Sequence, residues 1–273
     1  LISTLIEKGY AYESQGDVYF RALKFDEYGK LSHQPIDDLE SGARIDVSDI
    51  KENPLDFALW KTAKPGEPYW DSPWGKGRPG WHIECSVMAK RYLGDTIDIH
   101  CGGQDLIFPH HENEIAQSEC ANGCEFAHLW MHNGYINVDN RKMSKSLGNF
   151  FTVRDVAEKY GYEPIRFLMI SSHYRSPINY STEIIEQSKN ALDRLYNCRA
   201  NLTFAINNGG GESNKSADEF INKRREQFIR VMDDDFNTAD GISAVFDLVR
   251  DINTFIDSGA DKAELEKCLA AFD

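Results

Sequence analysis

The chain has 273 residues, enough for one large domain or two ordinary ones, and its 41% hydrophobic and 27% charged residues are typical of a folded globular protein. The net charge of −14 argues against nucleic-acid contact over most of the surface. No apolar run is long enough to span a membrane and no signal segment opens the chain, so we expect no membrane partner. Six cysteines are too few for a disulfide scaffold and favour a reducing, cytoplasmic location.

Residues 1–8 have the pattern of the last turns of an amphipathic helix, which Gly9 would close. No initiator methionine or helix cap precedes them, and residues 267–273 stop inside another helical pattern. We therefore expect a central fragment of a longer protein that lacks both ends.

Residues 10–21 predict a β-hairpin whose turn contains Gly16. The polar segment 24–49 predicts loops and short elements. Between Pro65 and Gly80, eight of sixteen residues are proline or glycine, so this segment predicts an irregular connector.

From residue 81 the pattern becomes helical until Leu93, and residues 96–100 predict a strand. Pro109 is expected at the first position of a helix that reaches about Ala121. A second strand at 134–138 follows. Helices that alternate with strands, with polar residues at the strand ends, predict an α/β fold with a parallel, Rossmann-like sheet.

Two further helix starts are predicted at Thr152 and near Pro164, and strands stop after about residue 181. A helical period then runs from Ile184 until the glycine-rich break near 207–211. Ser216 predicts a capping box with the glutamate three residues later, and Asn237 predicts the cap of the next helix. The C-terminal part is therefore expected to be a helical bundle.

The segment 141–149, Arg-Lys-Met-Ser-Lys-Ser-Leu-Gly-Asn, predicts a cationic loop at the end of a strand. Lys142 and Lys145 are suited to neutralising the charge that develops on a nucleotide polyphosphate, although a solvated basic turn is the simpler alternative for any lone Lys-x-x-Lys. The full string resembles the signature loop of the class I aminoacyl-tRNA synthetases.

The string His-His-Glu-Asn-Glu at 110–114 indicates a metal site, because His110 and Glu114 are four residues apart and share a helix face, whereas His111 and Glu112 point elsewhere. The alternative is a polar helix surface. A thiolate would complete the donor set, and spacing alone does not choose between Cys85 and Cys101.

Four strings in the same order and spacing resemble the cysteinyl-tRNA synthetase family: Gly-Trp-His-Ile-Glu-Cys, His-Cys-Gly-Gly-Gln-Asp, Phe-Pro-His-His-Glu-Asn-Glu and Lys-Met-Ser-Lys-Ser. Residues 233–239 also resemble that family. The resemblance implies one zinc ion per subunit, held by Cys85, His110, Glu114 and a further cysteine from an N-terminal stretch. That stretch and the family's His-x-Gly-His-type motif are not in this sequence.

The resemblance also implies how cysteine is selected. Serine differs from cysteine by one atom, and packing contacts discriminate poorly between near-isosteres. A zinc ion that binds the substrate thiolate favours sulfur without editing. Trp81 would form a wall of that pocket, or else pack in the core.

Several residues are expected to contact ATP and the adenylate. The glycines at 102 and 103 would let the backbone approach adenosine or would simply make a tight turn, and Asp105 would accept hydrogen bonds from the ribose. His100 would lie near the adenylate or be a structural histidine. The predicted substrate and nucleotide contacts are Trp81, His100, Gly102, Gly103, Asp105, Met143, Ser144, Lys145 and Ser146.

The resemblance implies four segments: the end of the first catalytic half with a connective insertion (1–80), the second Rossmann-like half (81–150), a stem-contact connector (151–182) and a truncated bundle of the tRNA-binding type (183–273). The expected partners are cysteine, ATP with Mg²⁺ and tRNA(Cys), and a monomer is expected. The reaction would form cysteinyl-adenylate and then transfer cysteine to tRNA, although this fragment is not expected to form adenylate unaided.

Three other functions remain open. A cysteine ligase of the same ancestry would acylate an amino-sugar amine instead of tRNA. A zinc hydrolase would use Glu112 as its base, but it leaves the lysine loop without a role. A catalytically inactive binding module is the third.

Overall fold

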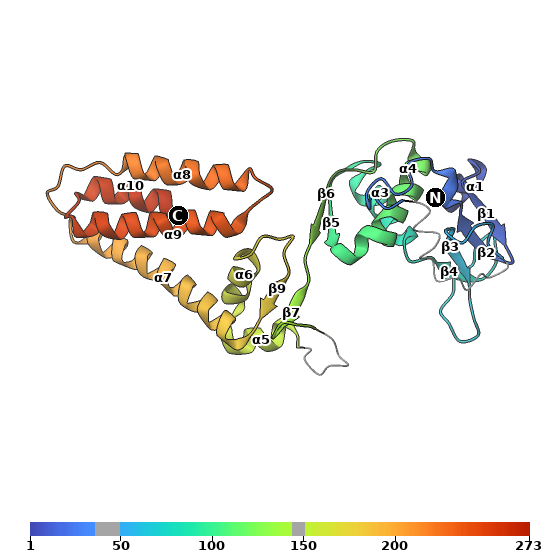
Figure 1. Ribbon diagram of the computed structural model, residues 1–273, viewed down its shortest axis with the longest axis horizontal. Coiled ribbons are helices and arrows are strands. Elements are labelled where there is room, and N and C mark those ends of the chain that lie inside the picture. Colours follow the sequence, from blue (N-terminus) through green and yellow to red (C-terminus); the bar gives the residue numbers. More distant parts are fainter. Residues whose placement is uncertain (36–49, 144–150) are drawn as a thin grey trace. The chain divides into compact units, whose positions relative to one another are not determined.

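The computed structural model describes residues 1–35, 50–143 and 151–273 and divides into two compact units, Leu1–His132 and Asn133–Asp273 (Figure 1). Each unit has a hydrophobic core of its own. Within the described ranges, no helix is both long enough and apolar enough to cross a bilayer. The predicted loop residues Ser144, Lys145 and Ser146 lie outside these ranges.

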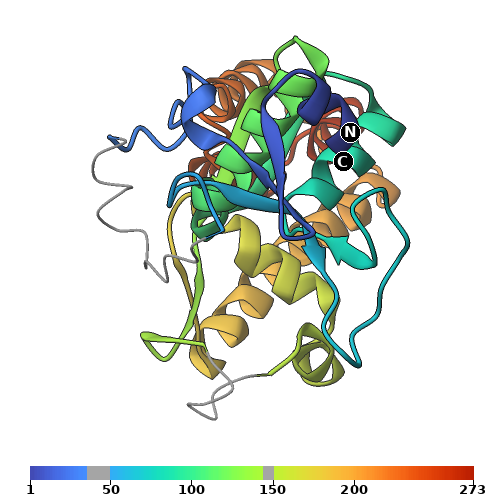
Figure 2. The same ribbon diagram turned by 90° about the vertical axis from the view of Figure 1, so that its right-hand side faces the viewer.

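The first unit opens with helix α1 (Ile2–Glu7) and a four-stranded antiparallel sheet in the order β1-β2-β3-β4. Its strands are β1 (Ala11–Ser14), β2 (Asp17–Phe20), β3 (Phe57–Thr62) and β4 (Gly77–Pro79). The two turn residues between β1 and β2, Gln15 and Gly16, both have positive φ, at 55° and 86°. This backbone suits a two-residue hairpin, so the predicted hairpin, dark blue in Figure 2, is confirmed.

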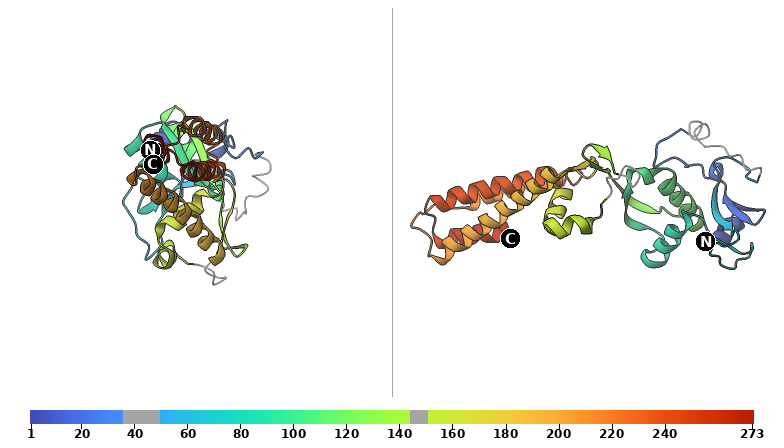
Figure 3. Two further views of the ribbon diagram at one scale, coloured as in Figure 1. Left: turned by 90° about the vertical axis from the view of Figure 1, so that its left-hand side faces the viewer. Right: turned by 90° about the horizontal axis from the view of Figure 1, so that it is seen from below.

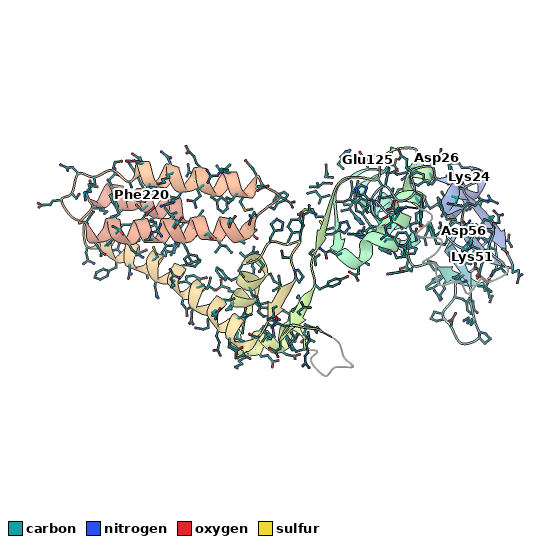
Figure 4. The ribbon with its side chains drawn as sticks, in the orientation of Figure 1. Lys24, Asp26, Lys51, Asp56, Glu125 and Phe220 are labelled. Carbon is teal, nitrogen blue, oxygen red and sulfur yellow. The ribbon has the colours of Figure 1, made fainter. Side chains whose placement is uncertain are left out.

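A buried carboxylate ties the segment before β3 to this hairpin. Asp56, labelled in Figure 4, accepts hydrogen bonds from the Tyr12 hydroxyl at 2.8 Å and from the backbone N–H groups of Asn53 and Ala22. Ala22 opens the short 3-10 helix η1 (Ala22–Lys24). Burial raises the pKa of Asp56, and these donors stabilise its ionised form. The connector at 65–80 is irregular up to β4, as predicted.

The remainder of the first unit carries the chemistry. Its elements are α3 (Ile83–Leu93), β5 (Ile97–Gly103), the 3-10 helix η2 (Gln104–Leu106), the π-helical turn η3 (Ile107–His111), α4 (Glu112–Asn122) and β6 (Ala127–Asn133). β5 pairs with β6, and a small core of Ile97, Ile115 and Phe126 lies beneath them.

Of two predicted helix starts in this region, one differs from the structure and one is confirmed. The helix expected from residue 81 begins at Ile83 after a turn, so Trp81 precedes it. Phe108 has extended backbone angles (φ −133°, ψ 134°) that interrupt η3, so Pro109 is the first helical residue after this break, as predicted, and the chain stays helical from there through α4.

The second unit begins with a three-stranded sheet in the order β8-β7-β9: β7 (Ile136–Val138), β8 (Arg141–Lys142) and β9 (Ile178–Tyr180). β7 and β8 are antiparallel and are joined by Asp139 and Asn140, which both have positive φ, whereas β7 and β9 are parallel. The predicted strand and its Asp-Asn turn are therefore confirmed. Helices α5 (Val153–Tyr160) and α6 (Tyr162–Ile170) connect β8 to β9.

Four helices complete this unit, and Figures 1 and 3 show α8, α9 and α10 side by side. They are α7 (Thr182–Asn207), α8 (Asp218–Met232), α9 (Thr238–Asp257) and α10 (Lys262–Phe272). Their core includes Phe220, labelled in Figure 4, whose ring centroid lies 5.4 Å from that of Phe255.

The helix caps give a mixed result. Thr152 forms a capping box with Asp155 at the start of α5, and the Asn237 side chain accepts the Asp240 N–H at the start of α9, as predicted. The capping box predicted at Ser216 was wrong. The Ser216 hydroxyl accepts the Asp218 N–H instead, and the free N–H of Ala217 goes to a distant carboxylate, Glu264 on α10.

Candidate metal centre

Helices α3 and α4 are held together by a buried polar network. The Gln117 side-chain amide donates to the His82 carbonyl and to the Ser86 hydroxyl, both at 2.7 Å. The hydroxyl of Ser118 lies 2.9 Å from that of Ser86, which also reaches the carbonyl of Glu114. These contacts fix the first turn of α3 against the first turn of α4.

This packing places the predicted ligands around one point. Cys85 lies in the first turn of α3, His110 lies within the turn η3 before α4, and Glu114 lies in the first turn of α4. The ligand atoms of these three residues all lie within 4.8 Å of one another. Cys101, the rival thiolate, is exposed and belongs to neither donor group found among the described residues.

The Glu114 carboxylate is fully buried and lacks a proper donor. Its Oε1 lies 2.8 Å from His110 Nε2 and its Oε2 lies 3.1 Å from His100 Nε2. These are ion-pair distances, yet within the described part of the chain neither oxygen, nor His100 Nε2, has a partner in hydrogen-bond geometry. A buried carboxylate without donors is costly, and a cation at the centre of the cluster would remove that cost.

The orientation of the imidazole of His110 also suits a metal ligand. Its Nδ1 lies 2.8 Å from His82 Nδ1. Burial, and then the neighbouring His110, lower the pKa of His82 to about 4, so His82 is neutral at pH 7 and has a lone pair available as an acceptor. When His110 donates its Nδ1 hydrogen to His82, its Nε2 keeps a lone pair facing Glu114, which is the tautomer that metal binding needs.

The thiol of Cys85 must lose its proton before its sulfur can bind a metal ion. Burial, followed by the negative charges of Glu114 and Glu84, raises the pKa of Cys85. A bound cation reverses this balance, because it attracts the thiolate and neutralises Glu114. Thiolate, imidazole and carboxylate are all ligands that zinc accepts in tetrahedral geometry, so the three residues fit this ion.

A second donor group shares the same carboxylate. The ligand atoms of His100, His111 and Glu114 also lie within 4.8 Å of one another, and His111 Nδ1 is 2.8 Å from His132 Nε2. Burial and the surrounding histidines lower the pKa of His111 to about 3. The prediction that His111 points away was wrong, because His111 and Glu114 are three residues apart on one helical stretch, and residues at that spacing also share a helix face.

Sequence reasoning missed the supporting histidines, His82 and His132. His82 precedes α3 and His132 lies on β6, so no helical or strand period relates them to His110. The only signal was the presence of His82 within the Gly-Trp-His-Ile-Glu-Cys string.

Glu112 points away from the cluster, as predicted. Its carboxylate is fully buried and accepts hydrogen bonds from the backbone N–H groups of Gly29, Leu31 and Ser32. It therefore anchors the 29–32 loop and has no free oxygen directed at the donor group.

Other predicted contacts lie around the cluster. The Trp81 ring is 63% exposed, and its centroid lies 4.8 Å from that of His110, so it flanks the ligands and is not a core residue. A Cβ on Gly102 would lie 2.6 Å from His111 Cε1, so this glycine allows close packing against an imidazole. Asp105 is exposed near Gly103.

The lysine loop starts in the second unit. β8 ends at Lys142, and Met143 lines an apolar cavity of about 60 Å³ together with Phe151 and Val156. Phe151 is the first described residue after the loop, so both of its ends reach the same apolar site.

Comparison with known proteins gives a consistent result. The profile described as "tRNA synthetases class I (C) catalytic domain" matches residues 1–190, and the profile of the DALR domain matches residues 227–273. Together they confirm the predicted α/β catalytic fold followed by a helical region.

The chain is 60% identical over 260 residues to the Cysteine--tRNA ligase of Caldicellulosiruptor saccharolyticus, covering 94% of this chain and 56% of that protein. It is 56% identical over 279 residues to the Cysteine--tRNA ligase of Clostridioides difficile, covering 99% of this chain and 59% of that protein. The chain thus spans little more than half the length of these relatives.

A solved structure, the ternary complex of a LeuRS from Agrobacterium radiobacter with tRNA and LeuAMS, superposes with a TM-score of 0.56 at 15% identity. The match covers 77% of this chain and 30% of that chain, and it supports the fold alone.

Proposed function

This chain belongs to the family of class I (C) tRNA synthetases, and from that premise we propose that it is the central part of a cysteine–tRNA ligase. The whole protein would activate cysteine with ATP to cysteinyl-adenylate and then transfer cysteine to tRNA(Cys). The observation that carries this proposal is the convergence of Cys85, His110 and the Glu114 carboxylate, to which no described residue donates a hydrogen bond.

We propose that Cys85, His110 and Glu114 hold a zinc ion, with a fourth ligand from a cysteine outside this chain. When bound, zinc would supply a Lewis-acidic centre that coordinates the thiolate of substrate cysteine in preference to the hydroxyl of serine. His82 would keep the Nε2 of His110 free for the ion. Trp81 would form one wall of the amino-acid site, because its exposed ring lies against His110.

We propose that Lys142 and Lys145 act on the nucleotide. The attack of the cysteine carboxylate on the α-phosphorus of ATP builds negative charge on the departing pyrophosphate, which Mg²⁺ and these lysines would neutralise. No side-chain nucleophile is needed, because positioning and charge stabilisation account for this displacement. Met143, anchored in its apolar cavity, would fix the near end of the loop.

The remaining proposed contacts lie near strand β5. His100 faces Glu114, and we propose that Gly102, Gly103 and Asp105 line the adenosine site beyond the end of this strand. Ser144 and Ser146 are proposed to contact the phosphates. The reducing cytoplasm is the proposed location, since all six cysteines are free. The four domain boundaries and the monomeric state stay predictions.

The zinc-hydrolase alternative is less well supported, because the Glu112 carboxylate, its proposed base, accepts hydrogen bonds from three backbone N–H groups. The amino-sugar ligase is also less well supported, because the helices α7 to α10 and the named relatives both favour the tRNA enzyme.

The test is the substitution Cys85→Ser in the full-length protein that contains this chain. ATP–pyrophosphate exchange would be measured with cysteine and with serine as substrate. We expect the preference for cysteine to fall by roughly 100-fold, since packing alone discriminates poorly between the two amino acids. Cys101→Ser is the matched control and should keep the preference, because Cys101 lies outside the donor group. An unchanged preference in Cys85→Ser would refute the proposed role of zinc.

A further inference from the structure

The turn between α8 and α9 has an unusual backbone. Asp235 and Phe236 are consecutive non-glycine residues with positive φ, at 55° and 54°. Residues other than glycine rarely adopt this left-handed backbone conformation, and they do so where surrounding contacts hold it in place. The turn is also exposed, so core packing does not account for its conformation.

The Asp235 carboxylate makes the contacts that hold this turn. Its Oδ1 accepts from the Tyr174 hydroxyl at 2.7 Å and from Arg175 Nη2 at 3.1 Å, and its Oδ2 accepts from Arg175 Nε at 2.5 Å. His173 Nε2 lies 3.6 Å away. The hydrogen bond from Arg175, followed by that from Tyr174, lowers the pKa of Asp235 to about 2. A bidentate guanidinium contact fixes direction as well as distance.

Tyr174 and Arg175, which donate hydrogen bonds to Asp235, belong to the segment 172–176. This segment also contacts the residues that lead into β7. The Gly134 N–H donates to the Tyr174 carbonyl at 2.8 Å. A Cβ on Gly134 would lie 2.5 Å from the Ser176 carbonyl carbon, so the two backbones are in direct contact. Gly134 lies two residues before β7, and the β7–β8 hairpin leads to Lys142.

A continuous set of contacts therefore runs from the bundle to the lysine strand within one compact unit. It passes from α9 to Asp235, from Asp235 to the 172–176 segment, and from that segment to β7. A second contact supports the first joint, because the Thr238 hydroxyl at the start of α9 lies 3.5 Å from the Ser172 carbonyl.

We propose that Asp235 is a positioning residue that couples the helical bundle to the strand bearing Lys142. This inference rests on the proposed function, in which the bundle holds tRNA and the lysine loop serves the adenylate. Asp235 touches no substrate. It sets where tRNA held by the bundle stands relative to the β7–β8 hairpin, so it matters for the transfer of cysteine to tRNA and not for the formation of adenylate.

The test compares Asp235→Asn with Asp234→Asn in the full-length protein. Asparagine tolerates the left-handed conformation, so the first variant removes the charge without straining the turn. Asp234 is exposed, makes no ion pair among the described residues and loses the same charge, so it is the matched control. The measurements are kcat/KM for tRNA charging and the rate of ATP–pyrophosphate exchange.

We expect Asp235→Asn to lower kcat/KM for charging by roughly 10- to 100-fold while exchange stays within about 2-fold, because small displacements of bound substrates cost this much in rate. Asp234→Asn should leave both reactions unchanged. Unchanged charging in Asp235→Asn, or an equal loss of charging and exchange, would overturn the proposal, since an equal loss means a structural role alone.

Hydrogen exchange at the Gly134 amide separates this proposal from the proposed function. Asp235→Asn and Arg175→Gln should each speed that exchange and the double variant should add little, because both remove the same contact. Unchanged exchange would refute the coupling. If the unaltered protein shows no cysteine-dependent ATP–pyrophosphate exchange, the proposed function fails instead, whatever the Gly134 amide does.

Discussion

The carboxylates of Asp235 and Glu114 both lie at short distances from cationic or potentially cationic groups, and they differ in their burial and in their hydrogen-bond donors. Asp235 in the second unit is exposed and receives well-directed hydrogen bonds from Arg175 and Tyr174. Glu114 in the first unit is fully buried and faces His100 and His110, and none of the described residues offers it a donor in hydrogen-bond geometry. Arg175 and Tyr174 stabilise the charge of Asp235, whereas the proposed zinc ion would do so for Glu114, so burial and donor geometry, and not distance, mark Glu114 as the candidate metal ligand.

The largest expected effect comes from removing the charge of Glu114. Glu114→Gln should weaken zinc binding by roughly 100- to 1,000-fold, because an apparent binding energy of about 10–16 kcal/mol for structural zinc, shared among about four ligands, gives about 2.5–4 kcal/mol for each. The zinc content and zinc affinity of the full-length protein measure this effect. Glu125→Gln, an exposed change outside the donor group, is the control. Equal affinity in the two variants would mean that Glu114 is not a ligand.

Glu112 sharpens the comparison, because it is buried like Glu114 but supplied with donors like Asp235. Glu112→Ala should destabilise the protein by about 3 kcal/mol, since it leaves three backbone N–H groups near 29–32 without their acceptor. Urea unfolding measures the change, with exposed Glu125→Ala as the control. Normal stability combined with lost activity would instead restore Glu112 as a catalytic base.

A substitution of His82 tests whether this residue orients His110 for metal binding. His82→Ala removes the acceptor for His110 Nδ1, so the tautomer with a free Nε2 is no longer held. We expect zinc affinity to fall by roughly 10- to 100-fold, the range typical of groups that orient a metal-bound histidine. His128→Ala, an exposed histidine paired with Glu125, should leave the affinity unchanged. If both variants bind zinc normally, His82 does not orient His110.

The smallest expected effect is on the pH at which the Asp235 carboxyl group titrates. Its folded-state pKa of about 2 lies below the ordinary value of 3.8, so its ion pair stabilises the fold fully above pH 4 and loses this contribution as the pH falls toward 2. Arg175→Gln should raise the pKa of Asp235 toward the ordinary value. Carbon NMR of the labelled carboxyl group, titrated from pH 6 to pH 2, measures the shift. An unchanged titration would show that Arg175 does not stabilise the carboxylate.

Local interactions made much of the fold predictable. The β1–β2 hairpin follows from a two-residue turn that requires positive φ, and the caps at Thr152 and Asn237 follow from side chains that reach their own backbone. Ser216 shows where this reasoning ends. Its helix start was predicted as a local capping box, but Glu264, 47 residues away from Ala217, takes the free N–H.

In the candidate site, too, the contacts within one stretch of chain were predictable and those between distant segments were not. The sequence by itself determined that His110 and Glu114 would meet, because four residues along one short stretch of chain bring two side chains to the same face. The spacing of His111 and Glu114, three residues apart on the same helical stretch, also predicts that they meet, whereas only the tertiary structure decided that Cys85 and not Cys101 completes the group and that His82 holds His110. These outcomes depend on how α3 packs against α4, and contacts between segments distant in the chain leave no period in the sequence from which to predict them.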